Sequence, residues 1–117
     1  AIFTPLLVND LAKILAQMVE QGLAGLYHVF SRQSISKYDF GLLIARRFGL
    51  DERLISPASV WEGGLSARRS PNLSMRIDKL ARDLQITPPS QADGIERLYQ
   101  LWQQGFPARI RQMGQVS

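Results

Sequence analysis

Few residues in this 117-residue chain combine a side-chain type and a spacing that could support catalysis. The single histidine, His28, could act as a general base for a serine, or it could be a hydrogen-bonded structural residue. We interpret it as structural because it lies inside the apolar, strand-like run GLYHVF. The acidic pairs Asp51–Glu52 and Asp78/Asp83 resemble surface residues and converge on no identifiable site. The chain has no cysteine, which excludes thiolate nucleophiles and cysteine-based zinc sites, and one histidine excludes a multi-histidine metal site.

The stretch from Gly22 to Gly25 resembles the start of a dinucleotide-binding turn, but the glycine pattern of that turn is incomplete. His28 stands where the third glycine belongs. The turn also lies between a predicted helix and a predicted strand, the reverse of the order that a pyrophosphate site requires. The phosphate-binding pattern GxxxxGK is absent from the sequence. On residue types alone, the chain is a small α/β domain without a catalytic constellation.

The composition is basic, with 14 Lys and Arg against 10 Asp and Glu, a net charge of +4 and a pI near 10.0. Such a balance makes nucleic-acid binding one hypothesis, because a basic surface attracts polyanions. The arginines are scattered, however, and no aromatic pair is spaced like a base-stacking platform. We therefore expect a mildly basic, solvated surface and no nucleic-acid partner. No apolar run approaches the ~20 residues of a membrane span. We accordingly expect no membrane partner, and the absence of cysteine fits a reducing, cytoplasmic setting.

The apolar periodicity predicts helices separated by short strands and loops. Residues 1–10 form an extended run that leads to Asn9, the expected N-cap of a helix that ends at Gly22. GLYHVF (25–30) reads as a buried strand, and RLISPAS (53–59) as a short strand running into a loop over 60–73.

Three further helices are expected. One covers about 37–48, with Ser36 as N-cap and Gly49 as C-cap, and one covers about 76–84. The last is capped by Ser90 and ends before Gly105. Residues 108–117 read as a loose polar tail. The fold class is thus α/β, an α+β-like fragment with about four helices and two or three short strands. The apolar start at Ala1 also suggests a piece of something longer.

Four stretches resemble extended short-chain dehydrogenase/reductases, in the family's order: TPLLVNDLA (4–12), GLYHV (25–29), SISKYDFGLLIA (34–45) and ARRSPNLSMRIDKL (67–80). The last is most similar to the corresponding segment of dTDP-4-dehydrorhamnose reductases and their relatives. The resemblance implies that residues 1–107 form the C-terminal, sugar-nucleotide-binding region of such an enzyme.

The same resemblance implies that a missing N-terminal Rossmann domain binds NADPH or NADH and carries the catalytic Tyr-x-x-x-Lys. None of the tyrosines Tyr27, Tyr38 and Tyr99 has a lysine four residues later. We therefore expect no catalytic residues and no cofactor-binding residues in this chain, which alone should not act as an enzyme.

Three residues are carried over as candidate substrate-binding residues. Arg69 matches the family's arginine and either binds a diphosphate bidentately or is a solvated loop residue. Asn72 either touches the sugar or caps its turn, and Trp61 either stacks on a base or covers the loop. The chain departs from the family pattern at Ser70 and Arg76, which stand where proline and aspartate are usual.

The partners implied are a nucleotide-sugar substrate and the Rossmann domain. Apolar surface left uncovered by that domain makes self-association an expectation for the isolated chain. The alternative hypothesis is a stand-alone binding or interaction domain that kept the fold and lost the catalysis.

Overall fold

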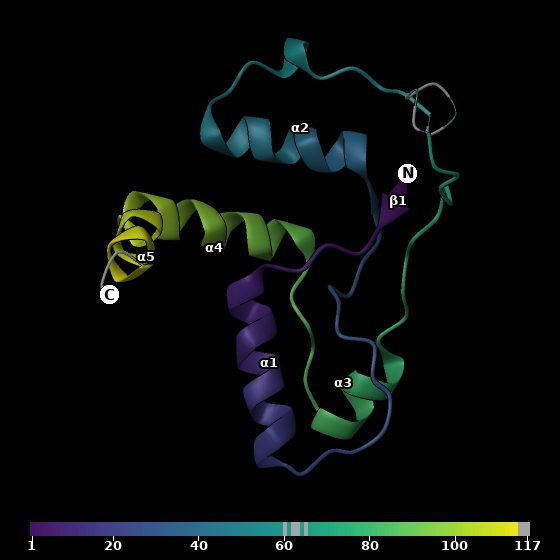
Figure 1. Ribbon diagram of the computed structural model, residues 1–117, viewed down its shortest axis with the longest axis vertical. Helices are drawn as coiled ribbons and strands as arrows, with labels where there is room; N and C mark the ends of the chain where they lie inside the picture. The colour runs from purple at the N-terminus through teal and green to yellow at the C-terminus, as the bar shows by residue number, and fades with distance from the viewer. Residues whose placement is uncertain (60, 62–63, 65, 115–117) are drawn as a thin grey trace.

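A computed structural model describes residues 1–59, 61, 64 and 66–114 (Figure 1). These residues form an α/β fragment with a two-stranded sheet, one 3₁₀ turn and five α-helices. The elements in chain order are β1 (Ile2–Phe3), α1 (Val8–Glu20), β2 (Ile35–Ser36), α2 (Lys37–Phe48), the 3₁₀ turn (Glu52–Leu54), α3 (Asp78–Leu84), α4 (Gln91–Gln103) and α5 (Phe106–Gly114). Among the described helices, none combines the length and apolar character that crossing a membrane demands.

The N-terminal strand joins two distant parts of the chain. β1 pairs antiparallel with β2, with Ile2 opposite Ser36. On its other side, the Ile2 amide donates to the Pro71 carbonyl at 2.9 Å, and the Leu73 amide donates to the Ile2 carbonyl at 2.7 Å. Because one residue is bonded on both sides, the start of α2 and the segment 71–73 lie next to each other.

The two helices with local capping signals form as predicted. The Ser36 hydroxyl accepts the Asp39 amide at 3.0 Å, and Gly49 ends α2 in the left-handed conformation at φ 69°. Ser90 and Asp93 form a reciprocal capping box at the start of α4. Both helices end at residues that the sequence predicts, because caps depend only on neighbours along the chain.

Helix α1 begins two residues earlier than expected. Leu7 occupies the N-cap position without a side-chain cap, and Asn9 is already helical. Asp10 is buried and pairs with Arg97 of α4 at 2.7 Å. A tertiary ion pair thus lies in the first turn of α1, and the prediction of Asn9 as the cap was wrong.

Neither of the strands predicted downstream of α1 forms. Residues 25–30 are irregular and Leu26 is 76% exposed, because no described strand lies beside this segment to pair with it. His28, which we expected as a structural residue within a buried strand, is exposed and lies in this irregular segment. Residues 53–59 begin in the 3₁₀ turn, where Asp51 Oδ1 accepts the Arg53 amide at 3.0 Å, and continue as an irregular segment.

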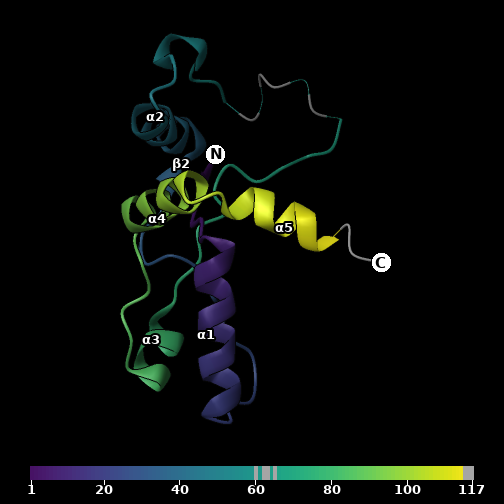
Figure 2. The same ribbon diagram turned by 90° about the vertical axis from the view of Figure 1, so that its left-hand side faces the viewer.

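Residues 108–114 are helical where we expected a loose polar tail over 108–117, and residues 115–117 lie outside the described part of the chain. Gly105 turns the chain at φ 75°, and the Arg109 amide donates to the Gly105 carbonyl at 3.1 Å. Pro107 lies in the first turn of α5, where a missing amide hydrogen costs no helical bond. Figure 2 shows α5 projecting from the end of α4.

The helices form two groups (Figure 1). In one, α2 contacts α4 through Arg47, which binds Glu96, and through Phe48, which packs edge-on against Tyr99 at 5.3 Å. In the other, α1 and α3 share a core of Ile14, Leu80 and Leu84. The irregular segment 25–30 is attached to this core through Tyr27.

Tyr27 also ties this segment to α3 by a hydrogen bond. Its hydroxyl donates to Asp83 Oδ2 at 2.7 Å, and Lys79 Nζ donates to the Leu26 carbonyl at 2.8 Å. The Tyr27 hydroxyl, and secondarily Arg82, hold the pKa of the Asp83 carboxyl below its ordinary value. A carboxyl with a lowered folded-state pKa contributes stability above its unfolded pKa, and that contribution is lost as the pH falls through the folded pKa.

We predict that Tyr27→Phe flattens the acid side of the pH–stability curve. Wild type should lose free energy of unfolding as the pH drops below about 4, where carboxyls begin to protonate. Tyr27→Phe should lose less over the same range, because Asp83 no longer has its main hydrogen-bond donor. Urea unfolding over a pH series measures this, with Tyr38→Phe as the matched control. Identical slopes for Tyr27→Phe and wild type would contradict the assignment.

Candidate functional site

A cavity of about 840 Å³ lies where the start of α2 meets the segment attached to β1. Its walls come from the N-terminal residue, the first turn of α2, the irregular segment after the 3₁₀ turn, and the loop before Leu73. The lining residues are Ala1, Ser36, Lys37, Tyr38, Ile55, Ser56, Pro57, Ala58, Ser59, Arg69, Ser70 and Leu73. This volume is within the ordinary range for small-molecule sites.

The charge of the lining favours an anion. Arg69 and Lys37 approach the cavity from two different segments, and no carboxylate is among the described residues that line it. The cavity also borders the N-terminus of α2, where the helix dipole is positive. Hydroxyl groups of Ser36, Tyr38 and Ser56 add hydrogen-bonding capacity. Cations and hydroxyls together suit a ligand with phosphate groups and further polar atoms.

The loop that carries Arg69 is shaped by Asn72. The Asn72 side-chain oxygen accepts the Ser74 amide at 3.0 Å and the Ser74 hydroxyl at 2.6 Å. The Ser70 hydroxyl donates to the Asn72 carbonyl at 2.9 Å and accepts the Asn72 amide at 3.3 Å. These bonds close the turn directly after Arg69, so Asn72 and Ser70 position the arginine beside the cavity.

The structure separates the three candidate residues. Arg69 lines the cavity, whereas Asn72 is not among the lining residues and its side-chain oxygen is used in the turn. Trp61 is 67% exposed and is also absent from the lining, in a stretch where residues 60, 62, 63 and 65 are outside the described residues.

Sequence reasoning missed Lys37 and Tyr38, which line the cavity together with Arg69. Both lie in the stretch 34–45, which the sequence analysis identified as a capped helix and as part of the family resemblance without assigning a binding role to either residue. The available signal was a cation and a phenol in the first turn of that helix, where an anion is favoured. No described residues form a group of three or more His, Cys, Asp or Glu side chains arranged to hold a metal ion.

Three comparisons relate the chain to known proteins. The model of the family described as "RmlD substrate binding domain" matches residues 2–104. Methionine adenosyltransferase 2 subunit beta of Danio rerio is 27% identical over 92 residues, which cover 72% of this chain and 28% of that protein. The crystal structure of dTDP-4-dehydrorhamnose reductase from Bacillus anthracis str. Ames, in complex with NADP, is similar with a TM-score of 0.73 and 26% identity. That match covers 82% of this chain and 34% of the reductase chain. The chain therefore spans about a third of the length of the relatives that it matches.

We predict that the Asn72 side chain acts mainly through the turn. Asn72→Ala should lower the free energy of unfolding by about 1 kcal/mol, the usual net value of a lost hydrogen bond. Asn72→Asp keeps the accepting oxygen and should stay close to wild type. Urea denaturation of the two variants measures the difference. Equal stability of Asn72→Ala and wild type would contradict the positioning role.

Proposed function

The chain belongs to the RmlD substrate binding domain family, and from this we propose that it is the nucleotide-sugar-binding part of an NADP-dependent reductase similar to dTDP-4-dehydrorhamnose reductase. The observation that carries the proposal is the cavity whose described lining holds Arg69 and Lys37 and no carboxylate. The NADP bound to the similar reductase supports the choice of cofactor for the longer protein.

Each part of a nucleotide sugar has a complementary part of this cavity. The Arg69 guanidinium takes a pair of diphosphate oxygens, since its planar fork matches two acceptors at once. Lys37 neutralises charge from the first turn of α2, as a point cation that needs no fixed geometry. The hydroxyls of Ser36 and Ser56 bind sugar hydroxyls, and Ile55, Pro57 and Leu73 cover apolar faces of the ligand.

In this proposal the chain orients the substrate and does not perform the chemistry. The relatives are about three times as long as the region that they share with this chain. We assign NADP binding and proton transfer to a Rossmann domain in the remaining part of the longer protein. Holding the sugar in one orientation toward that domain contributes to the rate by lowering the entropic cost of reaching the reactive geometry.

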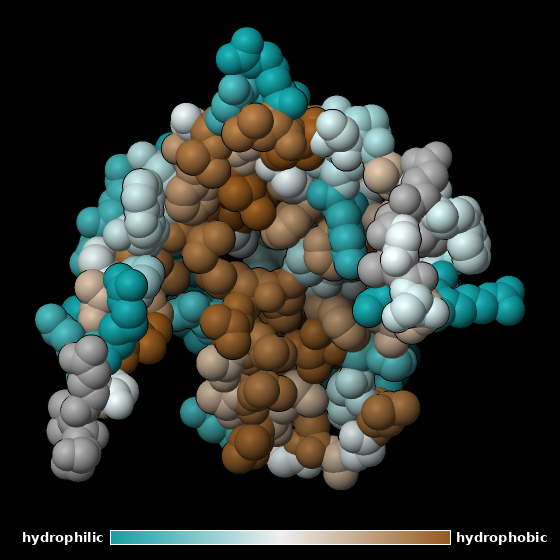
Figure 3. All heavy atoms as spheres, turned by 45° about the horizontal axis from the view of Figure 1, so that its top comes forward, coloured by the Kyte–Doolittle hydropathy of each residue, from teal (hydrophilic) through white to brown (hydrophobic). Residues whose placement is uncertain are grey.

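An exposed apolar stripe on α1 supports the proposal that another domain packs against this helix in the longer protein. Val8, Leu15 and Val19 are 69%, 46% and 80% exposed and lie on one side of the helix, since their spacing of seven and four residues matches its period. Leu26, just after the helix, is also exposed. Apolar residues gather around a central hollow and continue over the part of the molecule that α1 occupies (Figure 3). We propose that the Rossmann domain covers this stripe in the longer protein.

We predict that Arg69→Ala weakens the binding of dTDP to this chain by about 10- to 100-fold, corresponding to a lost charged hydrogen-bond pair. The matched control is Arg68→Ala, which removes the neighbouring exposed arginine outside the cavity lining and should change the dissociation constant about twofold or less. Isothermal titration calorimetry measures both. Thymidine, which has no phosphate, should bind weakly to all three proteins.

Two results would contradict this proposal. Equal losses for Arg68→Ala and Arg69→Ala would show that dTDP is held by general surface charge, as in the nucleic-acid hypothesis. Undiminished affinity in Arg69→Ala would place the diphosphate elsewhere.

We also predict that the isolated chain self-associates through the apolar stripe on α1. Sedimentation velocity should show an average size that rises with concentration, because apolar surface that lacks its partner is buried between copies. Val19→Lys should reduce the effect, whereas Leu54→Lys, on an equally exposed residue of the 3₁₀ turn, should not. A wild-type chain that stays monomeric at all concentrations would instead favour a stand-alone binding domain.

A further inference from the structure

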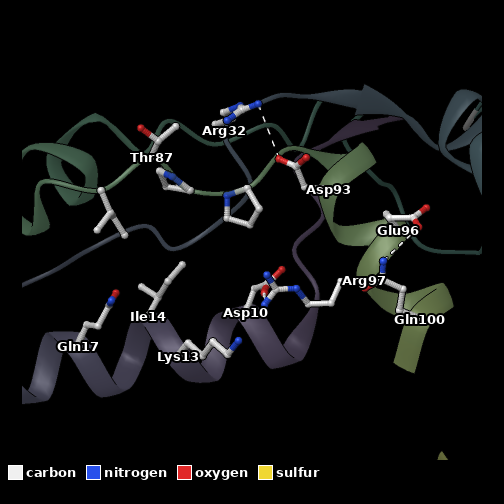
Figure 4. A pocket seen from close by; sticks show the side chains of 13 residues that line it. Asp10, Lys13, Ile14, Gln17, Arg32, Thr87, Asp93, Glu96, Arg97 and Gln100 are labelled. Carbon is white, nitrogen blue, oxygen red and sulfur yellow. Dashed lines mark hydrogen bonds and ion pairs between the residues drawn. The ribbon is translucent and has the colours of Figure 1, made fainter. Parts of the chain in front are cut away.

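Two cavities beside α4 differ in their chemistry. One, of about 590 Å³ between α1 and α4, is lined by three carboxylates and three cations whose charges offset one another (Figure 4). The other, of about 240 Å³, lies between residues 5–8 and the start of α4, with Phe40 of α2 as a further wall. We call this second cavity the apolar groove, because its described lining holds no charged side chain. It shares no lining residue with the cavity of Arg69.

Gln91 brings one unpaired hydrogen-bond acceptor to the apolar groove. Ser90 and Gln91 are the polar residues of its described lining, and Ser90 is used in the cap of α4. Gln91 is 6% exposed, and its Nε2 donates to the Gln33 carbonyl. Its Oε1 accepts no hydrogen bond in the described part of the chain. The unpaired side-chain atoms that are fully enclosed among the described residues are Thr4 Oγ1 and Asp10 Oδ2, so Gln91 Oε1 keeps accessible surface for a donor.

Gly94 leaves the groove open on the side of α4. It lies inside the helix, where glycine is less favourable than alanine because its backbone loses more conformational freedom. A Cβ at this position would meet Leu7 Cβ at 3.8 Å, which is an ordinary van der Waals contact. No described residue therefore approaches closely enough to require a glycine here. The space that Gly94 leaves is available to a group from outside the chain.

We propose that the apolar groove receives a tryptophan side chain of the Rossmann domain. The indole N–H donates to Gln91 Oε1, and the ring lies against Gly94 and the apolar walls of the groove. Indole has one donor and no acceptor, so a single unpaired oxygen satisfies it. Aromatic side chains that fill such pockets are common anchors of interfaces between proteins. This inference rests on the proposed function, which supplies the neighbouring domain.

Volume and position favour a side chain over a free ligand. Small-molecule sites usually begin at about 300 Å³, whereas a cavity of about 150 Å³ already holds benzene, so the groove matches one bicyclic ring. Val8 lines the groove and is also the first residue of the apolar stripe on α1. A domain that covers the stripe therefore also reaches the groove.

An NMR titration of the full chain with 3-methylindole, which reproduces the tryptophan side chain, tests the groove. The probe should shift the amide signals of Gly94 and Ile95. The analogue 1,3-dimethylindole, which has no N–H, should bind at least about threefold more weakly, because it makes no hydrogen bond to Gln91. Gly94→Leu fills the groove and should abolish binding. The matched control Gly114→Leu adds the same side chain at the end of α5, where a Cβ meets no described atom, and should bind like wild type.

Circular dichroism reports whether Gly94→Leu is folded. If it is not, Gly94→Ala decides the question, because alanine suits a helix and its Cβ makes no close contact. Gly94→Ala should weaken 3-methylindole about fivefold or more, since an added methyl group overfills a matched cavity. Gly41→Ala, the same change inside α2, is its control and should bind like wild type.

Several results would overturn the proposal. Equal affinity for the two indoles would leave no role for Gln91 Oε1. Absent binding in wild type, or unchanged binding in the folded Gly94 variants, would reject the groove as the site. Equal affinity of the chain and of the longer protein for 3-methylindole would show a groove that the Rossmann domain leaves empty. The dTDP affinity of the same samples tests the proposed function separately: a chain that binds 3-methylindole but not dTDP loses the nucleotide-sugar site and keeps the groove.

Discussion

The backbone of Ile2 is the constraint on which the candidate site depends. It is bonded to β2 on one side and to the segment 71–73 on the other, so it holds together parts of the chain that are far apart in sequence. The Lys37 amide adds a bond to the Ala1 carbonyl at 2.8 Å, which fixes the first residue of α2 to the same strand. Closing two long loops costs conformational entropy, and this cost is offset only when the hydrogen bonds on both sides of β1 form together. Without this strand, Lys37 and Arg69 would not face one cavity.

How much of the fold the sequence predicts depends on the distance over which each element is stabilised. The helices α2 and α4 form as expected because Ser36, Gly49 and Ser90 act on residues within one turn. The strand expected at 25–30 depends on a neighbouring strand, and none is present among the described residues to pair with it. β-branched and aromatic residues favour strands because they pack well on the surface of a sheet. Their presence in a segment therefore does not produce a strand where no sheet lies beside it.

The candidate site shows the same division. The resemblance pointed to Arg69, and this residue lines the cavity. Asn72 is nearby, but the network with Ser70 and Ser74 that makes it part of the turn is a matter of three-dimensional geometry. Lys37 and Tyr38 were absent from the prediction because a helix motif does not tell which distant loop will lie against its first turn. The same holds for the Asp10–Arg97 pair, which joins α1 to α4 across most of the chain.

The proposed binding mode places a diphosphate beside Arg69, in the cavity at the start of α2. A crystal structure of the chain with bound dTDP tests the central assignment most directly. Diphosphate oxygens should lie within hydrogen-bond distance of the Arg69 guanidinium, and Lys37 should face them from the start of α2. Density for dTDP between α1 and α4, with Arg69 in solvent, would contradict it.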